Sequence, residues 1–427
     1  MPSAAANKKK IINDPVHGFI SIPFNSTFDL IEHPYFQRLR RIKQLGLTSY
    51  VYPGACHTRF QHALGAAHLM DLAIDVLRSK GQDISDAEAE AAINAILLHD
   101  IGHGPFSHAL ENSIIEGVSH EDLSLLFMNR LNQQFKGSLE LSLRIFRNDY
   151  YKSFLHQLVA GQLDVDRLDY LKRDSFFTGV TEGVIGSDRI IKMLKVVDDR
   201  LVVESKGIYS IEKFLIARRL MFWQVYLHKA VLAAEIMMVK ILQRAKELCD
   251  RGIKLFADPD LEYFLYNHVT SADFAQLSED KADPGTTALP ALDHFANLDD
   301  NNIISSAKVW KDHDDPTLSM LCSSLIDRKL FRMIITDIPF DPRRIEQLRQ
   351  AAIKKYRIND TETGYFVDTG EISNNTYSSN DQQIQILFND GQLKDIPEAS
   401  DMLDLSVLSK IVKKHYICYP KELELLT

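Results

Sequence analysis

The chain has 427 residues and a formal charge of −9, with 45% hydrophobic and 25% charged residues. These proportions exclude a disordered chain, a collagen-like repeat and a disulfide scaffold. One small core does not account for the length, because single cores stop growing at roughly 250–300 residues. We therefore expect two or three lobes. The negative charge disfavours a basic nucleic-acid-binding protein, although it is compatible with a local basic pocket.

Neither a membrane span nor a secretory signal is expected. No apolar run reaches the roughly 20 residues that a span needs. The N-terminal sequence MPSAAANKKK has no apolar segment behind its lysines. The four cysteines are far apart and form no CxxC pair, so free thiols in a reducing cytoplasm are the simplest interpretation. We expect a cytoplasmic protein.

Residues 1–50 are expected to form an N-terminal segment of short extended pieces and a basic helix. The sequence IINDPVHGFISI has turn signals at NDP and at Gly18, followed by alternating apolar residues. The sequence HPYFQRLRRIKQLG predicts a helix that begins near Pro34 and ends at Gly46. A solvated helix face explains its basic residues as well as a ligand site does.

Residues 51–325 are expected to form a helical body. Apolar residues recur at helical spacing from residue 60 onward, and Ser85 with Glu88 predicts a capping box before the next helix. Glycines end that helix just after the pair His99-Asp100. Further helices are predicted as far as residue 250. The longest runs from about Ser210 to Cys249, as one helix or as two in series.

The character changes after residue 325. The sequences LFRMIITDIPF, GYFVDTG, IQILFNDG and KHYICYP predict strands, and DPRRIEQLRQAAIKKYRI predicts a helix. We assign residues 326–427 to a C-terminal α+β lobe. The predicted fold is therefore mainly α, a helical bundle with a smaller C-terminal α+β lobe.

Histidines gather in the first half of the helical body. More than half of the 15 histidines lie between His57 and His156, and HDIGHGPFSH alone contains three beside two glycines. A single histidine on an apolar helix is usually a packed or surface residue. A core, however, has no use for so many polar rings in one segment, whereas glycines let the backbone turn closely around an ion or a phosphate.

A metal site is predicted from His62, the pair His99-Asp100 and Asp166. Their separations place them on different helices or helix ends, so the facing sides of a bundle can bring them together. Imidazoles with carboxylates suit a divalent ion such as Mn, Fe, Co, Ni or Zn, or Mg with more retained water. Such an ion can polarise a phosphoryl group.

The order H…HD…D, with HDIGHGPFSH, resembles the HD-domain phosphohydrolases. The sequences HTRFQHALG, SHED, LDVDRLDYLKRD and RRLMFWQVYLHK are similar to one branch, the deoxynucleoside triphosphate (dNTP) triphosphohydrolases of vertebrates and bacteria. The similarity runs from about Lys10 to Lys229, and we expect no sterile-alpha-motif segment before it. The resemblance implies an HD-domain helical bundle and metal-dependent hydrolysis of dNTPs to deoxynucleoside and inorganic triphosphate.

The resemblance also implies roles for individual residues. The metal ligands would be His62, His99, Asp100 and Asp166. The catalytic residues would be His120 as general acid, with His103, Glu121 and Asp100.

The phosphate-binding residues would be Arg59, His103, His108, Arg167, Arg218 and Lys229, with arginine at 167 where the vertebrate pattern has lysine. The contacts to sugar and base would come from Gln44, Tyr170, Asp174 and Tyr226, with Phe222 where the pattern has histidine. Tyr170 would exclude a 2′-OH, and Asp174 would accept the 3′-OH.

A regulatory nucleotide site is implied in the N-terminal segment. Its residues would be Lys10, Asn13, Glu32, Gln37 and Arg40, with glutamate at 32 where the pattern has aspartate. An activating (d)NTP bound there would lie between subunits of a homo-oligomer, a dimer or tetramer. The alternative is a basic surface helix without a ligand.

Two other functions stay open from the sequence. An HD-domain phosphohydrolase can act on another nucleotide phosphoester, although Tyr170 and Asp174 favour the triphosphate branch. A nucleotide sensor with little turnover is the second alternative, and the intact metal ligands and His120 count against it. Strong nucleic-acid binding is disfavoured by the acidic charge.

Overall fold

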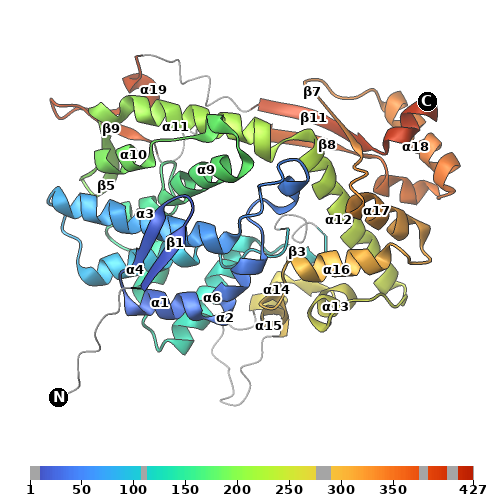
Figure 1. Cartoon of the computed structure of the whole chain (residues 1–427), viewed down its shortest axis with the longest axis horizontal. Helices are drawn as coiled ribbons and strands as arrows, with labels where there is room; N and C mark the ends of the chain where they lie inside the picture. Colours follow the sequence, from blue (N-terminus) through green and yellow to red (C-terminus); the bar gives the residue numbers. More distant parts are fainter. Residues whose placement is uncertain (1–9, 107–112, 276–289, 375–382, 402–411, 427) are drawn as a thin grey trace.

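Helices form most of the chain, which confirms the predicted mainly α fold (Figure 1). The computed structural model describes residues 10–106, 113–275, 290–374, 383–401 and 412–426. The helical body consists of α3 (Arg59–Ser79), α4 (Asp86–Leu98), α6 (His120–Gln134), α7 (Glu140–Phe146), α8 (Ser153–Val159), α9 (Val165–Thr178), α10 (Ser187–Met193), α11 (Ile208–Met221) and α12 (Lys229–Asp250). Helix α3 packs against both α4 and α9, so these three helices surround the site described below.

The helix ends follow the capping signals of the sequence. Ser85 and Glu88 form the predicted capping box of α4, in which the Glu88 carboxylate accepts a hydrogen bond from the Ser85 amide at 2.8 Å. Helix α9 begins at Asp164, whose carboxylate accepts a hydrogen bond from the Arg167 amide at 2.7 Å. It ends at Gly179, which adopts the left-handed conformation with φ 76°.

The N-terminal segment covers one side of α3. It consists of the antiparallel hairpin β1 (Lys10–Asp14) and β2 (Gly18–Ile22), then α1 (Asn25–Glu32) and α2 (Pro34–Gln37). The predicted helix from Pro34 to Gly46 is wrong beyond Gln37. A 3₁₀ turn follows, and the chain is extended by Lys43, because the amide of Lys43 bonds to Asp300 and that of Gln44 bonds to the His57 carbonyl. Both donors therefore leave the helical pattern.

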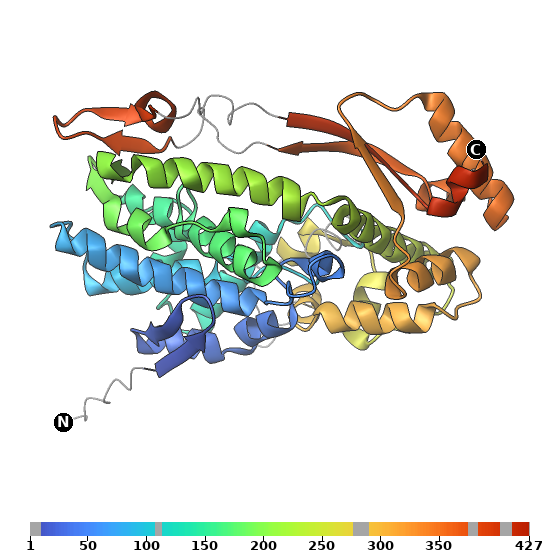
Figure 2. The ribbon, with the colours of Figure 1, turned by 45° about the horizontal axis from the view of Figure 1, so that its top comes forward.

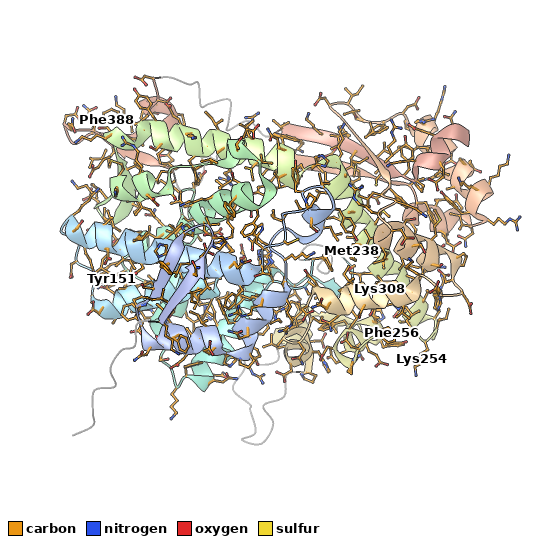
Figure 3. All side chains as sticks on the ribbon, in the orientation of Figure 1. Tyr151, Met238, Lys254, Phe256, Lys308 and Phe388 are labelled. Carbon is orange, nitrogen blue, oxygen red and sulfur yellow. The ribbon has the colours of Figure 1, made fainter. Side chains whose placement is uncertain are left out.

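The second half of the body consists of shorter helices. They are α13 (Pro259–Tyr266), α14 (Ser271–Ala275), α15 (Pro290–Phe295), α16 (Asp300–Trp310) and α17 (Pro316–Ile326). Short strands β3 (Ile115–Glu116) and β6 (Val269–Thr270) pair in parallel. Side chains fill the space between the helices (Figure 3), where Met238 of α12 is fully buried and Tyr151 and Phe256 lie at the periphery.

The predicted strands after residue 325 belong to two sheets. The first contains β7 (Arg332–Thr336), β11 (Val412–Tyr419) and β8 (Asp368–Asn374), in the order β7-β11-β8, all antiparallel. Helix α18 (Pro342–Tyr356) lies on this side of the molecule. The second contains β10 (Leu393–Asp395), β9 (Gln385–Leu387), β5 (Arg200–Glu204) and β4 (Leu194–Val197), in the order β10-β9-β5-β4.

The second sheet joins residues 385–395 to the helical body. Strand β9 runs parallel to β5, and the short helix α19 (Ile396–Ala399) contacts α11 (Figure 2). Ile386 is completely buried there. Residues that the sequence assigned to the C-terminal lobe thus add a strand pair to the body, while the first sheet contacts α12. Among the described helices, none combines the length and apolar composition needed to cross a bilayer.

Candidate metal centre and substrate cavity

The predicted metal ligands come from three helices that meet at one point. His62 lies one turn into α3, His99 caps the end of α4, and Asp166 lies in the first turn of α9. Gly102 allows the chain after His99 to turn against α6, because a Cβ there would lie 2.3 Å from the His120 carbonyl oxygen.

The ligand atoms of His62, His99 and Asp166 all lie within 4.8 Å of one another. Asp166 Oδ1 is 3.0 Å from His62 Nε2 and 3.4 Å from His99 Nε2. Both Nε2 atoms are buried, and neither makes a well-directed hydrogen bond to a described residue. Two imidazole nitrogens and a carboxylate that converge in this way form a cluster that can hold a metal ion.

The opposite nitrogen of each ring is already engaged. His62 Nδ1 is 2.7 Å from Asp169 Oδ2, and His99 Nδ1 is 2.6 Å from the Ile96 carbonyl oxygen. A carbonyl can only accept, so His99 Nδ1 carries the proton. An ionised Asp169 places the proton of His62 on Nδ1 in the same way. When the rings are neutral, both therefore direct the Nε2 lone pair at the cluster, as metal-ligating histidines do.

Asp166 and the neighbouring Asp169 shift the pKa of the histidine between them, His62. Burial disfavours a charged His62, but Asp166 and Asp169 outweigh it and raise the pKa of His62 to about 10. Burial also opposes charge on Asp166, yet the two imidazoles hold the pKa of this carboxyl below its usual range. A divalent ion can take the place of such protons, because it binds neutral imidazole and ionised carboxylate.

Asp100 lies at the edge of the cluster. Its Oδ1 is 3.3 Å from His99 Nε2, and its Oδ2 is 3.9 Å from His62 Nε2. Arg59 Nη1 donates to the same Oδ2, and His103 Nε2 is 3.2 Å from Oδ1. Asp100 thus links the metal cluster to a cation and to a further imidazole.

The two predicted catalytic histidines stack on each other. The ring centroids of His103 and His120 are 4.0 Å apart, with an interplanar angle of 16°. Burial, together with the nearby Arg59, lowers the pKa of His103 to about 3, so His103 is neutral near pH 7. His120 begins α6, and Glu121 is exposed in the same turn.

A cavity of about 460 Å³ is lined by half of the predicted substrate contacts. Gln44, Arg59, Tyr170, Asp174 and Tyr226 all line it. It is also lined by Phe222, which replaces the histidine of the family pattern. The lining residues that the sequence did not predict are Leu45, Gly46, Thr48, Phe106, Leu227, Leu232 and Glu235. Because Arg59 also contacts the predicted metal ligand Asp100, the cavity opens next to the cluster of His62, His99 and Asp166.

Asp174 lies on the cavity wall and accepts hydrogen bonds from two side chains. The Tyr226 hydroxyl donates to Asp174 Oδ2 at 2.7 Å, and His57 Nε2 is 2.7 Å from Oδ1. The His57 ring stacks on Phe177 with centroids 4.6 Å apart. His57 was not predicted as a site residue, although it begins the HTRFQH motif. Tyr170 lies beside Tyr226, with ring centroids 6.3 Å apart.

The turn that carries Tyr226 has an unusual helical geometry. Residues Phe222–Tyr226 form a π-helical turn between α11 and α12, so the predicted long helix is two helices in series. π-Helical turns occur often at functional sites. Here the turn places both Phe222 and Tyr226 on the cavity wall.

The predicted phosphate-binding cations differ in position. Arg167 bonds to Asp164 and to the Gly161 carbonyl. Arg218 lies close enough to Tyr170 and Arg167 to interact with both, and burial lowers the pKa of its guanidinium. Lys229 is exposed at the start of α12 and is not among the cavity-lining residues that the structure describes. His108 lies outside the described residues.

The predicted regulatory residues lie in the N-terminal segment, and most of them are exposed. Lys10, Asn13, Glu32 and Arg40 are exposed, and Gln37 is half-buried. The Arg40 Nε donates to Gln37 Oε1 at 2.8 Å, while Lys10 lies over the Phe28 ring. These contacts leave the nucleotide site a prediction.

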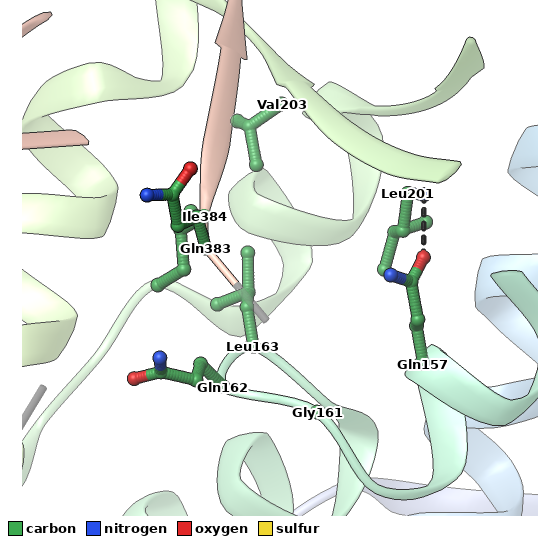
Figure 4. A pocket seen from close by; sticks show the side chains of 8 residues that line it. All are labelled: Gln157, Gly161, Gln162, Leu163, Leu201, Val203, Gln383 and Ile384. Atoms are coloured by element: carbon green, nitrogen blue, oxygen red, sulfur yellow. Dashed lines mark hydrogen bonds between the residues drawn. The ribbon is translucent and has the colours of Figure 1, made fainter. Parts of the chain in front are cut away.

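A second cavity lies between the loop before α9 and strand β5 (Figure 4). It measures about 20 Å³ and is lined by Gln157, Gly161, Gln162, Leu163, Leu201, Val203, Gln383 and Ile384. Gln157 accepts a hydrogen bond from the Leu201 amide at 2.7 Å. This volume suits one water molecule rather than a nucleotide.

Comparison with known proteins agrees with this geometry. The HD domain family matches residues 59–171, which include the metal cluster, and the HD associated region matches residues 185–280. A crystal structure of a phosphohydrolase from Bacteroides thetaiotaomicron is 55% identical, with a TM-score of 0.91, and the match covers 96% of this chain and 100% of that one. The chain belongs to the HD-domain phosphohydrolases.

Two further relatives of this HD-domain protein differ in coverage. The uncharacterized protein YwfO of Bacillus subtilis is 29% identical over 99% of this chain and 94% of its own length. The deoxynucleoside triphosphate triphosphohydrolase SAMHD1 homolog of Dictyostelium discoideum is 33% identical over 57% of this chain and 51% of its own. The chain therefore spans about half the length of that dNTP-hydrolysing relative.

Proposed function

We propose that this HD-domain phosphohydrolase cleaves dNTPs in a metal-dependent reaction that releases deoxynucleoside and inorganic triphosphate. One observation carries the proposal. The cavity that opens beside the metal cluster has Arg59 in its wall together with Tyr170, Asp174 and Tyr226. A cation for phosphate and polar groups for a sugar thus share one space next to the metal ligands. The names of the SAMHD1 relatives support the same substrate class.

The metal ligands of the proposed reaction are His62, His99 and Asp166, with Asp100 as a fourth. A divalent ion bound there supplies Lewis acidity toward a phosphoryl oxygen and activates a nucleophile. Arg59, beside Asp100, is placed to bind a phosphate oxygen once a substrate enters. Arg167 and Arg218, which both interact electrostatically with Tyr170, would add positive charge, and we keep His108 and Lys229 as further proposed contacts.

His120 is the proposed general acid. The bond between the α-phosphorus and the 5′ oxygen breaks, so the leaving oxygen needs a proton. Histidine titrates near neutral pH and can donate one. Its stacking on His103, which itself lies 3.2 Å from Asp100, places His120 beside the metal cluster. Glu121 is the proposed partner that orients it.

We assign sugar selection to the cavity residues Tyr170, Asp174 and Gln44. Asp174 accepts hydrogen bonds, so a 3′-OH is the group that it is suited to bind. The Tyr170 ring restricts the space where a 2′-OH would lie, which favours deoxyribose. Gln44 has a buried Oε1 without a hydrogen-bond partner among the described residues, and a hydroxyl of the sugar would satisfy it.

The proposal includes activation by a nucleotide. An activating (d)NTP would bind Lys10, Asn13, Glu32, Gln37 and Arg40 between subunits of a homo-oligomer in the cytoplasm. The exposure of four of these five residues is consistent with a site completed by a second copy. Strong binding of nucleic acid is not expected.

A product assay tests the proposal. All four dNTPs are incubated alone and in pairs with Mg²⁺ or Mn²⁺, and inorganic triphosphate is separated from orthophosphate and pyrophosphate. We expect triphosphate and deoxynucleoside in equal amounts. Orthophosphate or pyrophosphate as the sole product would instead indicate a phosphohydrolase for another phosphoester. Hydrolysis only in mixtures would support the activating site.

A further inference from the structure

The metal ligand His62 is connected to the N-terminal hairpin through one buried carboxylate. Asp169 accepts two imidazole contacts on different oxygens. Its Oδ2 is 2.7 Å from His62 Nδ1, and its Oδ1 is 2.7 Å from His17 Nε2. His17 lies in the turn between β1 and β2, 152 residues away in the sequence. One carboxylate thus joins α3, α9 and the hairpin turn.

A second set of contacts fixes the hairpin turn itself. Asp14 Oδ1 accepts hydrogen bonds from the amides of Val16 and His17, both at 2.9 Å. Arg173 Nη1 donates to Asp14 Oδ2 at 2.8 Å, and its Nε donates to Asp169 Oδ2 at 2.9 Å. The turn that presents His17 is therefore bound to the same arginine that binds Asp169.

The network is fully enclosed and closely packed. The side chains of His62, Asp169 and Arg173 are completely buried, and those of His17 and Asp14 are 2% and 5% exposed. Gly65 of α3 provides the space, because a Cβ there would lie 2.0 Å from Asp169 Oδ1 and 2.3 Å from Arg173 Nη2. Two carboxylates face one arginine and two imidazoles, so the buried charges are paired.

We propose that Asp169 is a positioning residue for the metal ligand His62, and that His17 makes this positioning depend on the N-terminal hairpin. Asp169 keeps the His62 proton on Nδ1 and the Nε2 lone pair toward the metal cluster. His17 holds the other oxygen and so sets the rotation of the carboxylate plane. A displaced hairpin would release that oxygen and loosen His62. The inference rests on the metal-dependent function proposed above, but its readout is metal binding itself.

Calorimetric titration of the full chain with Mn²⁺, after chelator treatment, tests the proposal. Asp169→Asn is expected to raise the dissociation constant for Mn²⁺ by about 10–100-fold, the usual effect of losing such a partner. His17→Gln is expected to raise it by less. The double variant should bind Mn²⁺ no more weakly than Asp169→Asn alone, because both act through one carboxylate. The electron paramagnetic resonance spectrum of bound Mn²⁺ should change in the same variants.

The matched control is His68→Gln. The His68 ring lies 5.5 Å from the His17 ring, and no hydrogen bond between the described residues joins it to Asp169. The His68→Gln variant should bind Mn²⁺ with the affinity of the wild type.

Wild-type affinity for Mn²⁺ in Asp169→Asn would overturn the proposal. So would a double variant in which the two single increases of the dissociation constant multiply. If Asp169→Asn does not fold, unchanged affinity in folded His17→Gln overturns the link to the hairpin. A wild type that binds Mn²⁺ but does not cleave dNTPs overturns only the proposed function.

Discussion

At the scale of single residues, the cavity wall is organised around Asp174. This carboxylate has 1% exposure and takes hydrogen bonds from Tyr226 and His57. Neither donor comes from α9, which carries Asp174, so its orientation depends on three separate segments of the chain. A buried acceptor held in this way is already oriented before a ligand arrives, which reduces the entropic cost of binding.

Asp174→Asn is expected to remove discrimination by the 3′-OH. A hydrogen bond to a charged group is worth about 1.5–3 kcal/mol, so kcat/KM for dNTPs should fall by about 10–100-fold. 2′,3′-Dideoxynucleoside triphosphates lack the 3′-OH, so the substitution should lower kcat/KM for them only slightly. The measurement is the ratio of kcat/KM for the two substrate classes, with the exposed Asp188→Asn as control. An equal loss for both classes would remove Asp174 from the sugar site.

At the scale of elements, α4 carries the candidate metal ligand His99 at its end and a buried ion pair at its start. Glu88 caps the helix and binds Lys152 Nζ at 2.8 Å, and the Tyr150 hydroxyl donates to it at 2.7 Å. Burial opposes the charge of Glu88, but Lys152 and Tyr150 outweigh it and lower its pKa to about 2. The start of the helix is therefore stabilised by the ionised form.

The stability of the protein should depend on pH through Glu88. The unfolded chain has the ordinary pKa of 4.5, so the contribution is complete above that pH and is lost as pH falls toward about 2. Glu88→Gln keeps the cap but removes the charge. It should lower the free energy of unfolding at pH 7 by about 1.5–3 kcal/mol. It should also weaken the dependence of this free energy on pH in acid. Urea unfolding between pH 7 and acid conditions measures both. Glu262→Gln, exposed in the first turn of α13, should change neither.

At the scale of the whole molecule, Arg244 of α12 joins the body to later segments. This residue is 3% exposed and binds Asp315, Glu247 and Glu362. Asp315 caps α17, and Glu362 lies in the 3₁₀ turn before β8. Nearby carboxylates outweigh burial and raise the pKa of the guanidinium. One buried arginine thus holds three parts of the chain around the end of α12.

Arg244→Ala is expected to loosen the segment after α17. Removing one partner of a buried ion pair costs about 3–5 kcal/mol, because the remaining charges lose compensation. Arg251 also binds Glu247 but is exposed, so Arg251→Ala should cost less than about 1 kcal/mol. Urea unfolding gives both values. Limited proteolysis should cut Arg244→Ala first after residue 326, and cleavage confined to the body would contradict this arrangement.

The sequence by itself determined the helical fold and the HD-domain family, and it predicted the residues of a cluster that could hold a metal ion. Helix caps such as Ser85 with Glu88 and the histidine-rich turn after Leu98 are local signals, so neighbouring residues are enough to read them. The strand signal of IQILFNDG was also local and was correct for β9, whereas β10 was not predicted. The partner of β9 in the body was not predicted, because strand pairing with β5 depends on residues far away in the chain.

Only the tertiary structure decided which residues share the site. It brought Gln44, Arg59 and Tyr226 to one cavity wall and added His57 to Asp174. It ended the predicted basic helix at Gln37, and the backbone donors of Lys43 and Gln44 bond to distant residues. It also connected His17 to His62 through Asp169. No periodicity or spacing encodes such a contact, because it depends on how α3, α9 and the hairpin pack around Gly65. Local motifs determine which residue types the site contains, and long-range packing determines which side chains position them.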